Sequence, residues 1–102
     1  MAQFDVHKDR KGKLYPLLLD VQADVLSHLD TRVVVPLAPK RTYGAKPMRI
    51  VNPVVSIRGV EYVVVIQEIA AIAVAELGDR QGSLGQHRGE LIAALDFLLA
   101  GS

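Results

Sequence analysis

Histidine is the side chain in this sequence best suited to acid–base or metal chemistry, but its three copies lie far apart in the chain. They are His7, His28 and His87, and no HxxxH or CxxC spacing joins them. His28 stands near Asp24 and Asp30, a combination that also occurs in catalytic sites. A solvated loop histidine is the commoner reason for such a grouping, so we assign no catalytic residue, metal ligand or cofactor and expect a non-enzyme.

Sequence signatures of other chemistries are absent as well. No glycine-rich phosphate loop follows a predicted strand, no GxSxG motif occurs, and there is no cysteine. Half of the 102 residues are hydrophobic and only 5% are aromatic, which predicts one domain over residues 1–102 with an aliphatic core. No signal-peptide core or apolar run of ~18 residues occurs. We therefore expect a soluble cytoplasmic protein that binds partners and does not contact membranes.

Basic residues are concentrated in two predicted loops in the first half of the chain. Such loops suit an acidic partner or phosphates. Solvated turns that keep a hydrophobic protein soluble are an equally good interpretation. The first loop holds Lys8, Arg10, Lys11 and Lys13, and the second holds Lys40, Arg41, Lys46 and Arg49.

The hydrophobic pattern that must position these side chains predicts a mainly β protein. The apolar runs at 14–21 and 32–37 suit strands that are buried on both faces or closed into a small barrel. Pro36 has no backbone N–H and is expected at a strand edge, a bulge or a strand end. Further strands are predicted at residues 4–7, at 48–57 with an interruption near Asn52-Pro53, and at 60–67 after a tight Arg58-Gly59 turn.

The C-terminal part of the sequence predicts one helix. Residues 69–77 fit either a helix or a strand, and the three glycines of 78–85 predict a loop. The helix is expected from Leu84, with Ser83 as N-cap and Gly101 as its stop. Phe97 falls on its polar side, as a subunit contact or shielded by a loop. The apolar face of this helix is predicted to hold Leu84, Leu91, Leu95, Leu98 and Leu99.

These runs also carry a family resemblance. The segments LLLDVQADVL at 17–26 and TRVVVPLAP at 31–39 resemble the CcdB family, toxins that are encoded beside an antitoxin and poison bacterial DNA gyrase. Gln3-Phe4 at the start and NPVVSI at 52–57 extend the likeness, as does the helical pattern of 84–102. The resemblance therefore covers nearly the whole chain.

The resemblance implies a fold and a set of partners. The fold is mainly β with one C-terminal α-helix: an SH3-like barrel, or antiparallel sheet, of about five strands with a small extra sheet, as in CcdB and MazF. The likeness also favours a strand near 72–77. The implied protein is a homodimer that binds the GyrA subunit of DNA gyrase and is neutralised by the flexible C-terminal segment of a CcdA-like antitoxin. No direct nucleic-acid readout is expected.

The resemblance also implies contact residues. By charge, the basic side chains Lys8, Arg10, Lys11, Lys40 and Arg41 are candidates for antitoxin contact. By resemblance, the gyrase contacts are Val25, Leu26, Asp96, Ala100, Gly101 and Ser102.

The chain departs from the family at its end. A Trp-Gly-Ile tripeptide usually follows the helix, whereas this sequence has Ala100-Gly101-Ser102 and so lacks the aromatic anchor. Three functions remain open at this point. The protein is a toxin that still poisons gyrase, an antitoxin-binding homologue that no longer does so, or a MazF-like endoribonuclease on the same fold.

Overall fold

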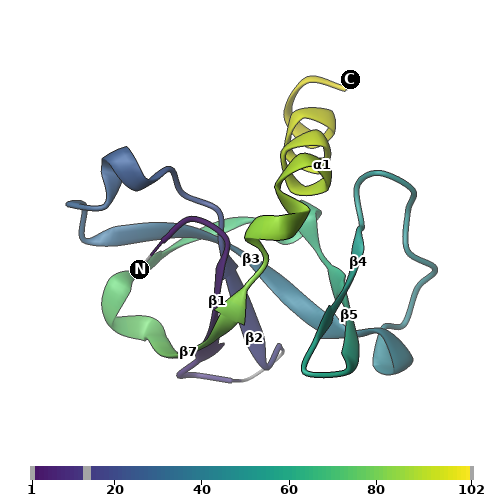
Figure 1. The fold of residues 1–102 in the computed structure, drawn as a ribbon, viewed down its shortest axis with the longest axis horizontal. Coiled ribbons are helices and arrows are strands. Elements are labelled where there is room, and N and C mark those ends of the chain that lie inside the picture. The colour runs from purple at the N-terminus through teal and green to yellow at the C-terminus, as the bar shows by residue number, and fades with distance from the viewer. Residues whose placement is uncertain (1, 13–14, 102) are drawn as a thin grey trace.

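The computed structural model describes residues 2–12 and 15–101, so Lys13, Leu14 and Ser102 lie outside the described residues. Within them the chain forms seven strands, five short 3₁₀ turns and one α-helix (Figure 1). The strands are β1 (Asp5–Asp9), β2 (Leu17–Asp20), β3 (Thr31–Pro39), β4 (Val54–Ile57), β5 (Val60–Val64), β6 (Ala70–Ala73) and β7 (Leu77–Ser83). The 3₁₀ turns are η1 (Asp24–Leu26), η2 (Lys40–Thr42), η3 (Ile66–Glu68), η4 (Val74–Glu76) and η5 (Gly85–His87), and the helix is α1 (Arg88–Ala100).

Strand β3 is the centre of the sheet, which runs in the order β4-β5-β3-β2-β1-β7. One edge of β3 pairs with β2, while its other edge pairs with β6 at residues 31–34 and with β5 at residues 37–39. Pro36 lies between these two partners, where Val65 N–H donates to its carbonyl oxygen. Of the three expected places, Pro36 is neither at a strand end nor on an edge strand; its missing N–H coincides with an irregularity in pairing, the change of partner along one edge of a central strand.

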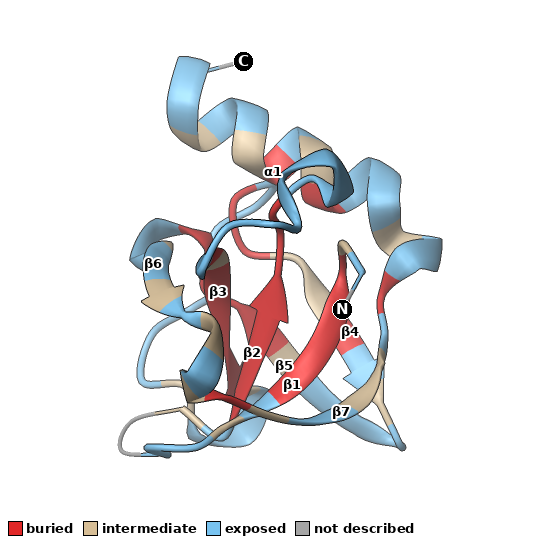
Figure 2. Cartoon of the chain, turned by 90° about the vertical axis from the view of Figure 1, so that its left-hand side faces the viewer, coloured by how far each residue is buried: buried red, intermediate tan, exposed pale blue. Residues whose placement is uncertain are grey.

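The predicted mainly β fold with one C-terminal helix is confirmed. The sheet curls into a half-barrel whose concave face holds the main core, and α1 covers one end of it (Figures 1 and 2). The described sheet has seven strands instead of about five, and the β4–β5 hairpin stands in place of a separate small sheet. Strands β2 and β3 are buried on both faces, as their apolar runs predicted, because smaller clusters around Leu18 and Ala38 cover the convex side.

The Arg58-Gly59 turn is confirmed by the register of the β4–β5 hairpin, in which Ile57 pairs with Val60. Arg58 and Gly59 have φ angles of 52° and 80°, the two positive values that a tight hairpin turn requires. The predicted strand over 48–57 is wrong in its first half. Residues 49–51 form a turn instead, followed by a bend at Asn52, whose side-chain oxygen accepts a hydrogen bond from the Met48 N–H.

Two predictions for residues 69–85 need correction. The strand expected near 72–77 is β6 at Ala70–Ala73, followed by a 3₁₀ turn. The glycine-rich segment predicted as a loop is strand β7, which pairs with β1 through an irregular ladder. Here glycine permits a close approach: a Cβ on Gly78 would lie 2.9 Å from the backbone oxygen of Lys8.

Helix α1 begins later than predicted. Residues 85–87 form a 3₁₀ turn, and the N-cap of α1 is His87, so the predicted Ser83 N-cap is wrong; the Ser83 hydroxyl accepts a hydrogen bond from the Gly85 N–H before the turn. The predicted stop is confirmed, because Gly101 has φ 75° and its N–H donates to the Phe97 carbonyl. Leu84 and Leu91 are buried as predicted, and Leu95 and Leu98 pack on the core. Leu99 is wrong as a core residue, since it is 78% exposed.

Candidate partner-binding surfaces

The loop between β2 and β3 presents the first pair of predicted gyrase contacts. Val25, in η1, is 80% exposed, and Leu26 is 43% exposed. The buried Gln22 side chain holds this loop from beneath: its amide nitrogen donates to the Leu26 carbonyl at 3.0 Å, and its oxygen accepts from Val33 N–H at 3.1 Å. Two apolar side chains therefore remain in solvent on a loop whose base is fixed.

A buried ion pair supports the same loop. Asp20 at the end of β2 and Arg32 near the start of β3 have no solvent exposure, and Arg32 Nε donates to Asp20 Oδ2 at 2.9 Å. Gln22 N–H donates to the other carboxylate oxygen at 3.0 Å. Among the described residues Arg32 Nη1 has no hydrogen-bond partner. The pair ties the two strands together where the loop leaves them, at the cost of desolvating two charges.

The second group of predicted gyrase contacts is the end of α1. Asp96, Ala100 and Gly101 are exposed, while Ser102 lies outside the described residues. Phe97 is 39% exposed, as its place on the polar side of the helix predicted. In Figure 1 the end of α1 rises above the half-barrel, and the η1 loop extends to the upper left of it.

Gln3 links these two elements. Its backbone N–H donates to the Asp24 carboxylate at 2.7 Å, and its side-chain oxygen accepts from Arg88 Nη1 at 2.9 Å. The Arg88 guanidinium also lies over the Phe4 ring, 5.7 Å from the centroid. Asp24 precedes the predicted contact Val25, and Arg88 is the first residue of α1. The N-terminal turn therefore couples the position of η1 to that of α1.

The basic residues predicted as antitoxin contacts are separated into two groups by the structure. Arg10 and Lys11 are engaged beside η4 and the start of β7: Arg10 Nε donates to the Leu77 carbonyl at 2.9 Å, and Lys11 pairs with Glu76 at 2.7 Å. The hydrogen bond with Glu76 raises the pKa of Lys11, and the same bond lowers the pKa of Glu76. These side chains thus have acceptors within the chain.

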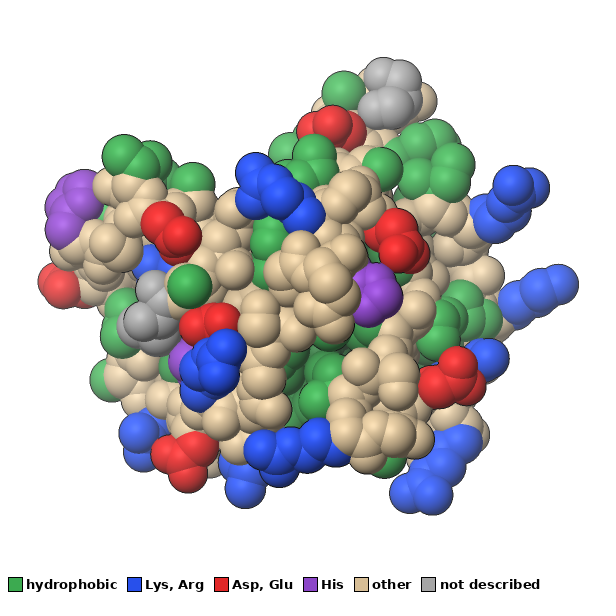
Figure 3. All heavy atoms as spheres, in the orientation of Figure 1, with side chains coloured by type: hydrophobic (Ala, Val, Ile, Leu, Met, Phe, Trp, Pro, Cys, Tyr) green, Lys and Arg blue, Asp and Glu red, His purple; other side chains and the backbone are tan. Residues whose placement is uncertain are grey.

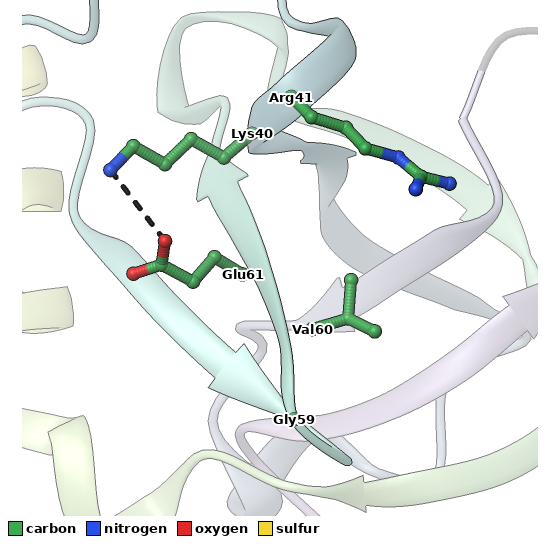
Figure 4. A pocket seen from close by; sticks show the side chains of 5 residues that line it. All are labelled: Lys40, Arg41, Gly59, Val60 and Glu61. Carbon is green, nitrogen blue, oxygen red and sulfur yellow. Dashed lines mark ion pairs between the residues drawn. The ribbon is translucent and has the colours of Figure 1, made fainter.

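Lys40 and Arg41 lie on η2, beside the β4–β5 hairpin. Lys40 pairs with Glu61 at 3.6 Å, while Arg41 points away from that pair, past Val60 (Figure 4). Together with Gly59 these residues line a hollow of about 530 Å³. Lys8, near the end of β1, lines a second hollow with Arg58. The sequence analysis assigned Arg58 only to a turn. Its positive charge could have added it to the candidate antitoxin contacts.

The histidines have separate structural roles. His7 is buried, and its Nδ1 lies 3.1 Å from the Gly78 carbonyl oxygen. Because a carbonyl oxygen only accepts, Nδ1 is the hydrogen-bond donor, and the bond links β1 to β7. His28 lies exposed in the loop after η1, and His87 contacts Glu90 at 3.1 Å. Within residues 2–12 and 15–101 no three His, Cys, Asp or Glu side chains group as metal ligands. None of the described helices is long and apolar enough to cross a bilayer.

The fold and its surfaces define a class of small half-barrel proteins with one covering helix. Two solved structures share this architecture. An endoribonuclease from Mycobacterial species matches with a TM-score of 0.77 and 19% identity over 97% of this chain and 90% of that chain. An endoribonuclease in complex with its cognate antitoxin, also from Mycobacterial species, matches with a TM-score of 0.78 and 18% identity over 97% and 94%. At these identities the likeness concerns the fold.

The family is given by the sequence itself. The model of the CcdB protein family matches residues 3–101, so the chain belongs to the CcdB family. The resemblance carried by the segments at 17–26 and 31–39 is thereby confirmed. Membership of this family supports the role of a toxin in a toxin–antitoxin pair.

Proposed function

We propose that this protein is a toxin that binds the GyrA subunit of DNA gyrase and traps the enzyme on cleaved DNA, and that a CcdA-like antitoxin neutralises it. Family membership supports the toxin role. The observation that carries the gyrase assignment is the exposure of Val25 and Leu26 on a loop whose base is held by buried hydrogen bonds. Apolar side chains presented on a fixed support bind a partner without first paying to order the loop.

The helix end supplies the second half of the proposed gyrase surface. Asp96, Ala100 and Gly101 are exposed there, and Ser102 follows them in the sequence. The side chains that replace the family's Trp-Gly-Ile end bury far less area, and loss of a central aromatic anchor commonly costs ~2 kcal/mol or more of binding free energy. We therefore expect gyrase poisoning by this chain to be weak and to depend chiefly on the η1 loop.

The test is gyrase-dependent cleavage of DNA by the purified proteins. Val25→Glu should reduce cleavage at least about tenfold, because a charge replaces apolar contact at the centre of the surface. Met48→Glu is the matched control: Met48 is 50% exposed and lies in the 43–53 loop, so cleavage should not change. Ala100→Trp with Ser102→Ile should strengthen cleavage. No cleavage with either the natural or the altered tail would reject gyrase as the target.

The same assay separates the other two functions. An antitoxin-binding homologue would leave gyrase unaffected even with the restored tail, yet still form a complex with its antitoxin. An endoribonuclease would cut RNA in the absence of gyrase, as the names of the two similar structures describe for those proteins. If the unaltered chain cleaved RNA, and the Val25→Glu variant cleaved it equally well, the endoribonuclease function would be favoured over gyrase poisoning.

The toxin is proposed to act as a homodimer. Phe97 supports this, since 39% exposure of an aromatic side chain on a helix leaves apolar area that a second copy would cover. Sedimentation at micromolar concentration should give the mass of two chains, and Phe97→Glu should shift the distribution towards one. A monomer at all such concentrations would contradict the proposal.

A further inference from the structure

Two hollows meet at the tip of the β4–β5 hairpin, on either side of Val60. The first, about 450 Å³, has Leu17, Ile57 and Tyr62 among the side chains that line it, with Lys8 and Arg58 also contributing. The second, about 530 Å³, is the hollow beside Lys40 and Arg41. Val60 lines both and is itself 44% exposed. We call the two hollows together the Val60 groove.

Among the described residues, three of the four cations of the Val60 groove have no acceptor, while the fourth, Lys40, pairs with Glu61 at 3.6 Å. In the part of the chain that the structure describes, the side chains of Lys8, Arg41 and Arg58 form no hydrogen bond or ion pair, whereas Arg10 and Lys11 are engaged elsewhere. Figure 3 shows Lys and Arg side chains gathered along the lower edge of the molecule, below a hollow lined by hydrophobic side chains. Unpaired cations beside apolar surface leave the groove complementary to an acidic, amphipathic ligand.

We propose that the Val60 groove binds an extended acidic peptide, with carboxylates at Lys8, Arg58 and Arg41 and an aliphatic side chain on Val60. This proposal rests on the proposed function, in which the peptide is a segment of the antitoxin. The sheet itself favours an extended chain, because β4 is its outermost strand on this side and edge strands accept added strands. The site brings together side chains from β1, η2 and the hairpin that are far apart in the sequence.

The lining of the groove favours a peptide over a phosphate chain. Asp9 and Glu61 are part of it, and their carboxylates would repel closely spaced phosphates, whereas peptide N–H groups can donate to them. Leu17 and Ile57 likewise offer apolar contact that a sugar–phosphate backbone does not use. A single-stranded RNA is therefore the alternative ligand against which the proposal is tested.

The probe is a short fluorescent peptide in which Glu and Leu alternate, titrated with the full-length protein at several salt concentrations. Arg41→Glu combined with Arg58→Asp should weaken binding roughly tenfold and flatten its salt dependence, because two exposed ion pairs become repulsive. Aspartate is chosen at position 58 because it tolerates the left-handed backbone there (φ 52°) better than glutamate. Arg41→Gln with Arg58→Asn should give an intermediate loss.

Lys46→Glu with Arg49→Asp is the matched control. It makes the same change in net charge at two exposed side chains outside the groove, and binding should stay within about twofold of the unaltered protein. Equal weakening by both double variants would show a non-specific charge effect and overturn the proposal. Tighter binding of a single-stranded RNA of equal charge, lost in the Arg41/Arg58 variant, would overturn the peptide in favour of a nucleic acid.

This outcome is separable from that of the proposed function. Gyrase-dependent cleavage tests the η1 end, and the Arg41/Arg58 variant should leave it unchanged because these residues lie at the hairpin end. Thermal unfolding of each variant, followed by circular dichroism, checks that the fold is retained. If the Arg41→Glu, Arg58→Asp variant bound the peptide normally, the Val60 groove would be rejected as the docking site. This conclusion would not depend on the result of the gyrase assay.

Discussion

The two ends of the half-barrel use charged side chains in opposite ways. At the η1 end Asp20 and Arg32 are completely buried and form an ion pair, while the exposed side chains of η1, Val25 and Leu26, are apolar. At the hairpin end the cations Arg41 and Arg58 are exposed. A buried pair fixes geometry and costs desolvation, whereas exposed cations act on a partner at a distance and contribute little to folding. The η1 end thus presents apolar side chains on a fixed loop, and the hairpin end presents positive charge.

The buried pair provides the largest expected effect. Arg32→Ala should lower the free energy of unfolding by about 3–5 kcal/mol, because it leaves the Asp20 carboxylate buried without its counter-charge. Urea unfolding measures the change. Asp20→Leu combined with Arg32→Met should cost less than Arg32→Ala, since no unpaired charge remains.

The matched surface change is Arg58→Ala, which should alter unfolding by no more than about 0.5 kcal/mol. If Arg32→Ala lowered the free energy of unfolding by as little as Arg58→Ala, the proposed difference between the buried pair and the exposed cations would be contradicted. The loop above the pair would then be held by Gln22 and not by the ion pair.

The helix allows a sharper version of the comparison within one element. Leu91 has no solvent exposure and contacts the main core, so Leu91→Ala should cost about 2–5 kcal/mol. Leu99 is 78% exposed, so Leu99→Ala should change stability by less than about 0.5 kcal/mol. Chemical denaturation of the two variants in parallel checks this. Similar losses for both would mean that the helix end is covered, for example by a second chain.

The smallest effect is expected for a surface pair on the convex side. Tyr15 donates its hydroxyl hydrogen to Glu68 at 2.6 Å, and this bond to the carboxylate raises the pKa of Tyr15 to about 12. The protonated hydroxyl is favoured by the fold, so its stabilisation is complete below pH 10 and is lost as the pH rises towards 12. Ultraviolet titration should show a tyrosine that ionises late, with a pKa of about 12.

Glu68→Gln should return the pKa of Tyr15 towards its ordinary value and remove the loss of stability in that pH range. The unfolding free energy near neutral pH should change little, because the pair is at the surface. A late-titrating tyrosine that persists in Glu68→Gln would assign the shift to another residue.

Much of the candidate site could not be predicted because it joins segments that are distant in the chain. Asp20 and Arg32 stand in the segments that carried the family resemblance, yet nothing local indicates that they form a buried pair. Arg58 joins Lys8 only because the hairpin and β1 meet at one hollow. By contrast, the resemblance singled out Val25 as a gyrase contact, and in the structure its side chain is 80% exposed.

The sequence by itself determined the features that depend on neighbouring residues. The continuous apolar runs of β2 and β3 specified strands buried on both faces, Arg58-Gly59 specified a two-residue turn, and Gly101 specified the end of α1. Tertiary structure decided the features in which pairing outweighs local preference. The glycine-rich segment 78–83 belongs to strand β7 because β1 has a free edge there, and Pro36 remains within β3 because the two partners of that strand separate at its position.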